Sequence, residues 1–108
     1  NILPCEIKNG QISFEGKILP SNTNIKKTNF SKTQVGIRPE FIKFSNDGIP
    51  VKIKRVSDTG RHKVIDTECS SGSIKILANT STQIPSGSAH ITFDQKHTYA
   101  YGDNWIIE

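Results

Sequence analysis

Residues 49–77 read IPVKIKRVSDTGRHKVIDTECSSGSIKIL, and this stretch decides the fold. In an extended chain, Ile49, Val51 and Ile53 would share one face, and Lys52 and Lys54 would share the other. Glycine-containing turns follow at residues 58–60 and 70–72, and apolar residues, mostly β-branched, resume after each turn. The stretch therefore predicts three consecutive antiparallel strands, over residues 49–56, 62–69 and 73–77.

Similar signals predict strands on both sides of this stretch. The Asn9-Gly10 pair favours a tight hairpin turn, because both residues tolerate positive φ. Pro39 lacks an N–H for a strand ladder, so it must end the strand expected over residues 35–40 or place it at a sheet edge. Besides that one, we expect strands over residues 5–7, 11–14, 17–19, 41–44, 88–93 and 104–107. Short strands separated by frequent turns predict a small OB-like barrel.

The composition supports an all-β fold. The chain has 108 residues and 12.0 kDa, which is enough for one domain, and 33% of its residues are hydrophobic. Sixteen Ile and four Val stand against three Leu, three Ala and no Met. Because β-branched residues favour strands, this excludes an all-helical fold. No apolar run approaches the roughly 20 residues that a membrane-spanning helix needs.

Two segments depart from this pattern. Residues 21–34 are rich in Ser, Asn, Thr and Lys, with only Ile25 and Phe30 as large apolar residues before Val35, and they predict an exposed, flexible loop. The chain begins at Asn1 rather than Met, and its first residues read as the interior of a polypeptide. We therefore expect residues 1–108 to be one domain of a longer chain.

The charge is unevenly distributed. Residues 1–63 carry twelve Lys and Arg against five Asp and Glu, whereas residues 64–108 carry two against five. A basic cluster could form an electrostatic groove for nucleic acid, but binders of single strands add aromatic residues on which bases stack, and the cluster lacks them. Nucleic-acid binding is therefore an alternative that we do not favour. The cluster comprises Lys52, Lys54, Arg55, Arg61, His62 and Lys63.

The sequence offers no catalytic constellation. It contains neither a GxxxxGK[ST] phosphate loop nor a GxGxxG motif, so we expect no ATP hydrolysis and no bound cofactor in this chain. His62, His90 and His97 lack the spacing of metal ligands. Cys5 and Cys69 are far apart and are expected to be reduced, inert thiols of a cytosolic protein. We expect the chain not to be an enzyme by itself, with no catalytic residue and no metal.

One motif is more specific than the rest. Val35-Gly36-Ile37-Arg38-Pro39-Glu40 resembles the G-[IV]-R-P-E motif of the accessory domain, called TOBE or MOP-like, that follows the nucleotide-binding domain in ATPase subunits of bacterial ABC importers. Residues 51–65 and 84–94 are similar to later strands of that family. Departures are Phe41, where the family usually has a polar residue, and the Tyr-rich stretch at residues 98–102.

The resemblance implies a MOP-like, OB-fold regulatory domain that does no chemistry. It implies import of a solute such as a sugar or glycerol-3-phosphate, with ATP and Mg²⁺ held in the missing nucleotide-binding domain. The implied partners are the same domain of a second ATPase subunit, its own nucleotide-binding domain, a regulatory protein and, indirectly, the membrane subunits. The implied location is cytoplasmic, peripheral to the inner face of the bacterial cell membrane. The candidate interface residues are Gly36, Arg38, Pro39, Glu40, Phe41 and Gly60.

The residues themselves leave more than one role open. Arg38 and Glu40 lie two apart in an extended segment, so we expect them to face the same way and either bridge to a neighbour or form a local ion pair. Gly36 and Gly60 fit turns or close packing better than ligand contacts. An oxyanion-binding module is a further alternative, with Ser70-Ser71-Gly72-Ser73 as its candidate loop.

Overall fold

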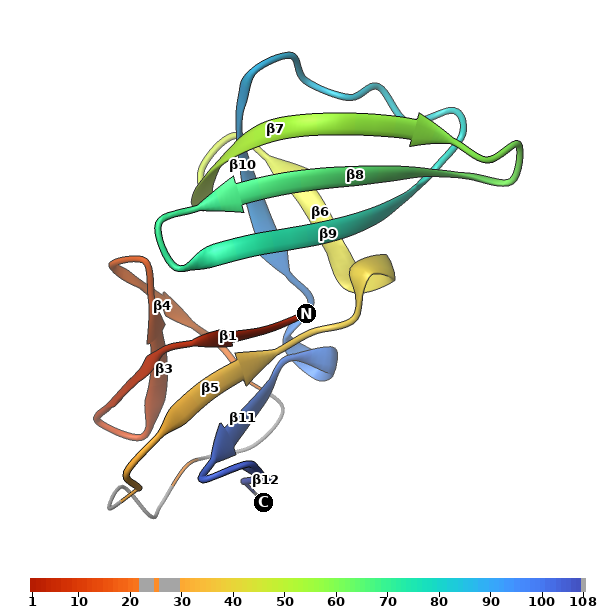
Figure 1. The fold of residues 1–108 in the computed structure, drawn as a ribbon. Coiled ribbons are helices and arrows are strands. Elements are labelled where there is room, and N and C mark those ends of the chain that lie inside the picture. Colours follow the sequence, from red (N-terminus) through yellow and green to blue (C-terminus); the bar gives the residue numbers. More distant parts are fainter. Residues whose placement is uncertain (22–24, 26–29, 108) are drawn as a thin grey trace.

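The computed structural model describes residues 1–21, 25 and 30–107, and their regular structure consists of strands and two short 3₁₀ helices (Figure 1). This confirms the prediction of an all-β fold of short antiparallel strands. Among these residues, no helix has the length and apolar character that crossing a membrane requires. The elements are β1 (Ile2–Pro4), β2 (Glu6–Lys8), β3 (Gln11–Phe14), β4 (Lys17–Leu19), β5 (Thr33–Gly36), η1 (Pro39–Phe41), β6 (Ile42–Ser45), β7 (Ile49–Asp58), β8 (His62–Cys69), β9 (Gly72–Asn79), β10 (Ser88–Phe93), η2 (Gln95–His97), β11 (Tyr99–Gly102) and β12 (Trp105–Ile106).

The strands form three antiparallel sheets. The largest has the order β6-β10-β7-β8-β9, and its outer strands β6 and β9 also contact each other, so the sheet curls toward a barrel. The other two sheets have the orders β1-β5-β11-β12 and β2-β3-β4. Figure 1 shows the five-stranded sheet at the top and the other two sheets below it, in a molecule of 43 × 24 × 20 Å. Two connections, one through η1 and one through η2, join the upper and lower parts.

The central strands β7, β8 and β9 form where the sequence predicts them. β8 pairs with β9 in continuous register from His62 opposite Asn79 to Cys69 opposite Gly72. The register of β7 against β8 shifts between Ile53 and Arg55, which is a β-bulge. Apolar residues of β7 face the core up to this bulge, and beyond it the side chains are exposed apart from a half-buried serine.

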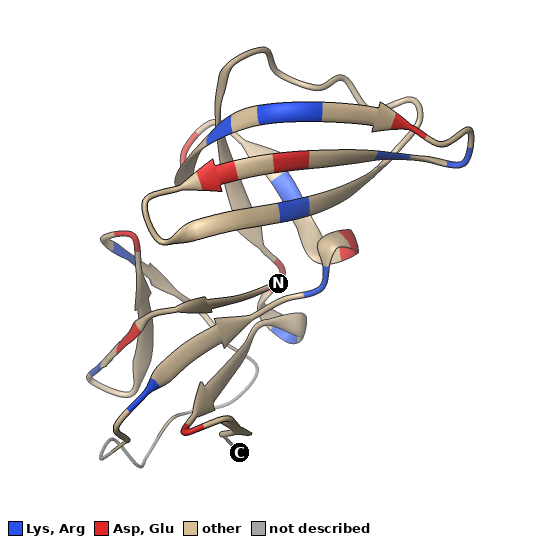
Figure 2. Ribbon diagram, in the orientation of Figure 1, with Lys and Arg blue, Asp and Glu red and all other residues tan. Residues whose placement is uncertain are grey.

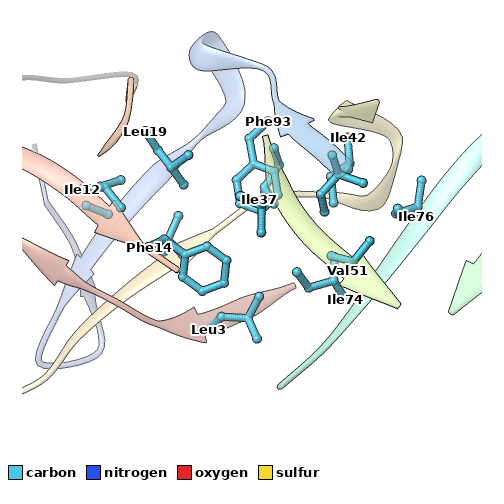
Figure 3. Packing of buried hydrophobic residues seen from close by; sticks show 14 of the residues in the cluster. Leu3, Ile12, Phe14, Leu19, Ile37, Ile42, Val51, Ile74, Ile76 and Phe93 are labelled. Carbon is cyan, nitrogen blue, oxygen red and sulfur yellow. The ribbon is translucent and has the colours of Figure 1, made fainter. Parts of the chain in front are cut away.

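One hydrophobic core connects the three sheets. In Figure 3, Ile37 and Phe93 lie between apolar side chains of β1, β3 and β4 on one side and of β7 and β9 on the other. The rings of Phe14 and Phe93 lie 6.2 Å apart between centroids, so the small sheet packs directly against the large one. Because each buried Ile or Phe contributes about 1.5–3 kcal/mol, this shared core holds the sheets together.

The strand expected over residues 35–40 is displaced. β5 begins earlier, at Thr33, and ends at Gly36, while Pro39 opens the 3₁₀ turn η1. Proline stops the ladder, and the Phe41 N–H bonds the Arg38 carbonyl at 3.1 Å to close the turn. Glu40 therefore lies in a 3₁₀ turn rather than in an extended segment.

The loop expected over residues 21–34 is wrong at its described positions 25, 33 and 34. The Ile25 side chain is buried in the core, and its N–H bonds the Gly10 carbonyl at 3.3 Å. Thr33 and Gln34 belong to β5, where they pair with β11. Thr33 and Gln34, which lie in a segment judged too polar to fold, are thus ordered by pairing with a strand distant in the sequence. Ile25 is ordered by burial of its side chain in the core. Residues 22–24 and 26–29 of the expected loop lie outside the described residues.

Candidate functional site

The two connections between the upper and lower parts of the molecule lie side by side. The Asp94 N–H bonds the Phe41 carbonyl at 3.0 Å. The rings of Phe41 and His97 stack with their centroids 3.5 Å apart and their planes 6° apart. Segments 36–41 and 94–101, distant in the sequence, are therefore joined by a hydrogen bond and a ring stack, and we call this junction the seam.

His97 is held in a fixed orientation at the seam. Its Nδ1 lies 2.6 Å from the Oδ2 of Asp94, and this hydrogen bond lowers the pKa of the Asp94 carboxyl. The Thr98 hydroxyl also donates to the Asp94 carbonyl at 2.7 Å, which fixes the turn around the carboxylate. With Nδ1 engaged, Nε2 is the ring nitrogen that remains for another partner.

A depression of about 550 Å³, which we call the seam groove, opens beside this junction. Arg38 and Phe41 come from the η1 connection, and His97, Tyr99 and Tyr101 from the η2 connection and β11. The remaining lining residues are Asn1, Ile2, Gly36 and Ile37. The seam groove thus combines a guanidinium, an imidazole and three aromatic rings.

Asn1 and Gly36 shape the groove by close contacts. The Asn1 side chain forms two hydrogen bonds of 2.8 Å with the backbone of Lys75, and the backbone carbonyl of Asn1 accepts a hydrogen bond of 2.9 Å from the Ile37 N–H. A Cβ at Gly36 would lie only 2.5 Å from Cε2 of Tyr101. Glycine is therefore needed at position 36 to let the Tyr101 ring lie across β5.

The Arg38 and Glu40 side chains do form an ion pair, but a loose one. Nη1 of Arg38 lies 4.0 Å from Oε2 of Glu40, and the side chains are 79% and 45% exposed. Such exposed pairs contribute about 0–1 kcal/mol to stability. The Arg38 guanidinium is therefore accessible from solvent at the edge of the seam groove.

Three of the six sequence-predicted interface residues have structural roles, Gly36 as described above together with Pro39 and Phe41, and Gly60 lies elsewhere. Pro39 starts η1, and the Phe41 ring stacks on His97. Gly60 lies in the β7–β8 turn with φ +90°, where its N–H bonds the Asp58 carboxylate at 2.8 Å. It does not line the seam groove. The structure thus brings Gly36, Arg38 and Phe41 together in the groove and leaves Gly60 in a distant turn (Figure 1).

Sequence reasoning missed the second half of the groove. Tyr99 and Tyr101 come from residues 98–102, which the sequence marks only as a departure from the resembled family, and His97 was considered only as a metal ligand. A usable signal was present, because Tyr99 and Tyr101 are two apart and so share one face of a strand. Their pairing with β5 is a long-range contact that no local pattern reveals.

The serine loop considered for oxyanion binding already binds a carboxylate of the chain itself. The Ser70 hydroxyl lies 2.7 Å from both carboxylate oxygens of Glu15, and the Ser71 N–H bonds one of them at 3.2 Å. The hydrogen bond from Ser70 lowers the pKa of Glu15. An external oxyanion at this loop would have to displace Glu15.

The members of the basic cluster that lie on β7 are next to acidic residues on β8 (Figure 2). Lys52 lies opposite Glu68, and Arg55 lies opposite Asp66. Asp66 also pairs with Lys75 of β9 at 3.9 Å. This surface therefore carries mixed charge rather than a continuous positive stripe, and a phosphate backbone would meet carboxylates along it.

The cysteines Cys5 and Cys69 are free thiols. Burial raises the pKa of Cys5 to about 11, and burial also raises the pKa of Cys69. Among the described residues, no three His, Cys, Asp or Glu side chains gather in a way that could hold a metal ion.

Comparison with protein-family models and with curated proteins finds no match.

Proposed function

We propose that this chain is the C-terminal accessory and regulatory domain of an ATP-binding subunit of a bacterial ABC importer for a sugar or glycerol-3-phosphate. In this role it supports association of the two ATPase subunits at the cytoplasmic face of the membrane. It binds neither ATP nor Mg²⁺, which belong to the nucleotide-binding domain of the parent subunit. The supporting observation is the arrangement of the Gly36-Ile37-Arg38-Pro39-Glu40 motif at the seam.

The motif divides into residues that the fold needs and residues that it does not. Gly36 accommodates Tyr101, Ile37 is buried in the core, and Pro39 starts η1. Arg38 and Glu40 point outward, and their mutual ion pair adds little to stability. Their presence in the motif is therefore better explained by a neighbouring domain or subunit than by folding of this chain.

The parent protein provides the test. The reading frame that encodes this chain should contain a phosphate loop upstream of Asn1. In the full-length subunit we expect Arg38→Glu to weaken ATPase self-association about tenfold or more, because a misplaced charge in an interface costs over about 1.4 kcal/mol. Sedimentation equilibrium with ATP measures the association, and steady-state ATP hydrolysis shows that the motor remains intact.

Lys54→Glu is the matched control, because Lys54 is an exposed cation of β7 away from the seam. It should leave self-association unchanged. A parent frame without a nucleotide-binding domain would refute the proposal. Equal association of the Arg38→Glu and Lys54→Glu subunits would refute the assigned interface.

A further inference from the structure

We propose that the seam groove binds a small organic anion, namely a molecule in which a phosphate or carboxylate is attached to a ring. This binding site does not depend on the accessory role proposed above, although both proposals involve Arg38. It would make the chain a receptor for a metabolite at a surface that joins the two parts of the fold.

The size of the groove fits a small molecule. Its volume of about 550 Å³ lies within the roughly 300–1,000 Å³ typical of ligand sites in proteins. Its walls come from two connections that are bonded and stacked on each other at Asp94, Phe41 and His97. The site is therefore preformed, so that binding has little ordering cost.

The charge of the lining selects an anion. Arg38 and His97 are the ionisable side chains of the lining whose charged form is a cation, and no carboxylate lines the groove. The nearest carboxylates contact these two residues from outside, Glu40 at 4.0 Å from Arg38 and Asp94 at 2.6 Å from His97. A guanidinium presents a planar fork of N–H donors that matches phosphate and carboxylate oxygens. Because the Arg38–Glu40 pair is long and exposed, a ligand anion can replace Glu40 at little cost.

The aromatic residues select a ring. Phe41 and His97 form a flat stacked pair, and Tyr99 and Tyr101 supply further rings along β11. Aromatic rings pack against planar groups and against the apolar faces of sugars, and each tyrosine also carries a hydroxyl for hydrogen bonding.

Two other depressions among the described residues lack this combination. The one beside β2 and β3 is lined by Glu6 and Glu15 together with Lys8. The one beside β6 and β9 is lined by Glu40 and Lys43 among mainly apolar residues. Carboxylates in these linings oppose an anion, so the seam groove is the site whose charge and rings act together.

Titration of the isotopically labelled chain by amide NMR tests the proposal with four probes. Phenyl phosphate and benzoate carry a ring and an anion, inorganic phosphate lacks the ring, and phenol lacks the charge. We expect saturable shifts at Gly36 and Tyr99 with at least one ring anion, at a Kd of about 1 mM or below. Inorganic phosphate and phenol should each bind at least about tenfold more weakly. The better of phenyl phosphate and benzoate identifies the anionic group.

Variants assign the anion contact. Arg38→Gln should weaken binding of the ring anion about tenfold or more. Arg38→Lys should lose less affinity, because lysine keeps the positive charge but lacks the planar pair of N–H donors of the guanidinium. Arg55→Gln, at an exposed arginine of β7 outside the groove, should bind like the parent chain. The dispersion of the amide spectrum shows that each variant is folded.

Three results would overturn the proposal: shifts that do not saturate with either ring anion, equal binding by the Arg38→Gln and parent chains, or inorganic phosphate or phenol binding as tightly as the better ring anion. None of these results bears on ATPase self-association, so the accessory role stands or falls separately.

Discussion

Gly48 offers the sharpest test of how the barrel closes. It lies in the turn between β6 and β7, and its φ is not positive. A Cβ built at this position would lie 2.4 Å from the carbonyl oxygen of Ile91 and 3.1 Å from its carbonyl carbon. A close approach of two backbones, rather than a left-handed conformation, therefore requires glycine at this position.

The magnitude follows from how firmly the obstructing carbonyl is held. The Ile91 carbonyl is held in place because Ile91, on β10, pairs with Phe44 of β6 on one side and with Ile49 of β7 on the other. Neither neighbour can yield without breaking a strand ladder. We expect Gly48→Ala to cost about 3 kcal/mol, at the upper end of the usual cost of overpacking. At about 4–8 °C per kcal/mol, this lowers Tm by roughly 12–24 °C.

Urea unfolding followed by circular dichroism measures the loss, provided that the m-value is unchanged. Gly60→Ala is the matched control, because φ at Gly60 is +90° and nothing lies within 4 Å of a Cβ there. It should cost about 1–2 kcal/mol through left-handed backbone strain alone. If Gly48→Ala loses less stability than Gly60→Ala, the steric reasoning is refuted.

Three further predictions concern polar groups and thiols. The Thr67 hydroxyl is buried and donates to the Ile74 carbonyl at 2.8 Å, so Thr67→Val should lower the free energy of unfolding by about 1 kcal/mol in urea titrations, and an equal or more stable variant would contradict this. The hydrogen bond from Ser70 lowers the pKa of Glu15 in the folded chain. This contact therefore stabilises the folded state at pH values above the pKa of an ordinary Glu carboxyl, and the stabilisation is lost as the pH falls through the lowered pKa of folded Glu15. Glu15→Gln should therefore flatten the acid side of the stability–pH curve, and an unchanged curve would show that the contact carries no linkage. With a pKa of about 11, Cys5 should react with iodoacetamide at pH 8 roughly a hundredfold more slowly than a free thiol, as peptide mapping by mass spectrometry would show, and a rate like that of a free thiol would disprove its burial.

The strands that follow each other closely along the chain could be predicted from the sequence. β7, β8 and β9 are joined by short glycine turns, and the alternation of buried and exposed residues is strict in β10. Such strands reveal themselves locally, because the side-chain period and the turn chemistry act over a few residues. Their bounds differ from the predicted ones by one or two residues, apart from the β-bulge, which no sequence signal announced.

The lower sheet could not be predicted in the same way. β1 and β11 have only three or four residues each, and both pair with β5 around the buried residue Val35, with Leu3 and Ala100 as its partners. These pairings join distant parts of the chain, and the short strands carry too few residues for a periodic signal. Strand content at Thr33 and Gln34 was hidden for the same reason, since their polar composition favoured a loop.

The candidate site was half predicted for the same physical reason. Gly36, Arg38 and Phe41 stand in one motif, which the sequence singles out. His97 and Tyr101 reach the same groove only because β11 lies beside β5 and because His97 stacks on Phe41. A local pattern identifies one wall of such a site, and the fold supplies the other.

Residues 35–38 contribute both to the core of the fold and to the seam groove. This determines which variants can change binding in the groove without changing stability. Val35 and Ile37 are buried in the core, Gly36 makes room for Tyr101, and Arg38 is the first residue of this run to leave the core. A change at positions 35–37 must therefore disturb packing and groove together, so a loss of binding there has two explanations. A change at Arg38 removes only an exposed charge, because its ion pair adds little to stability. Loss of anion binding at Arg38 without loss of stability would therefore separate recognition from folding, whereas an equal loss of both would place Arg38 among the residues that hold the seam.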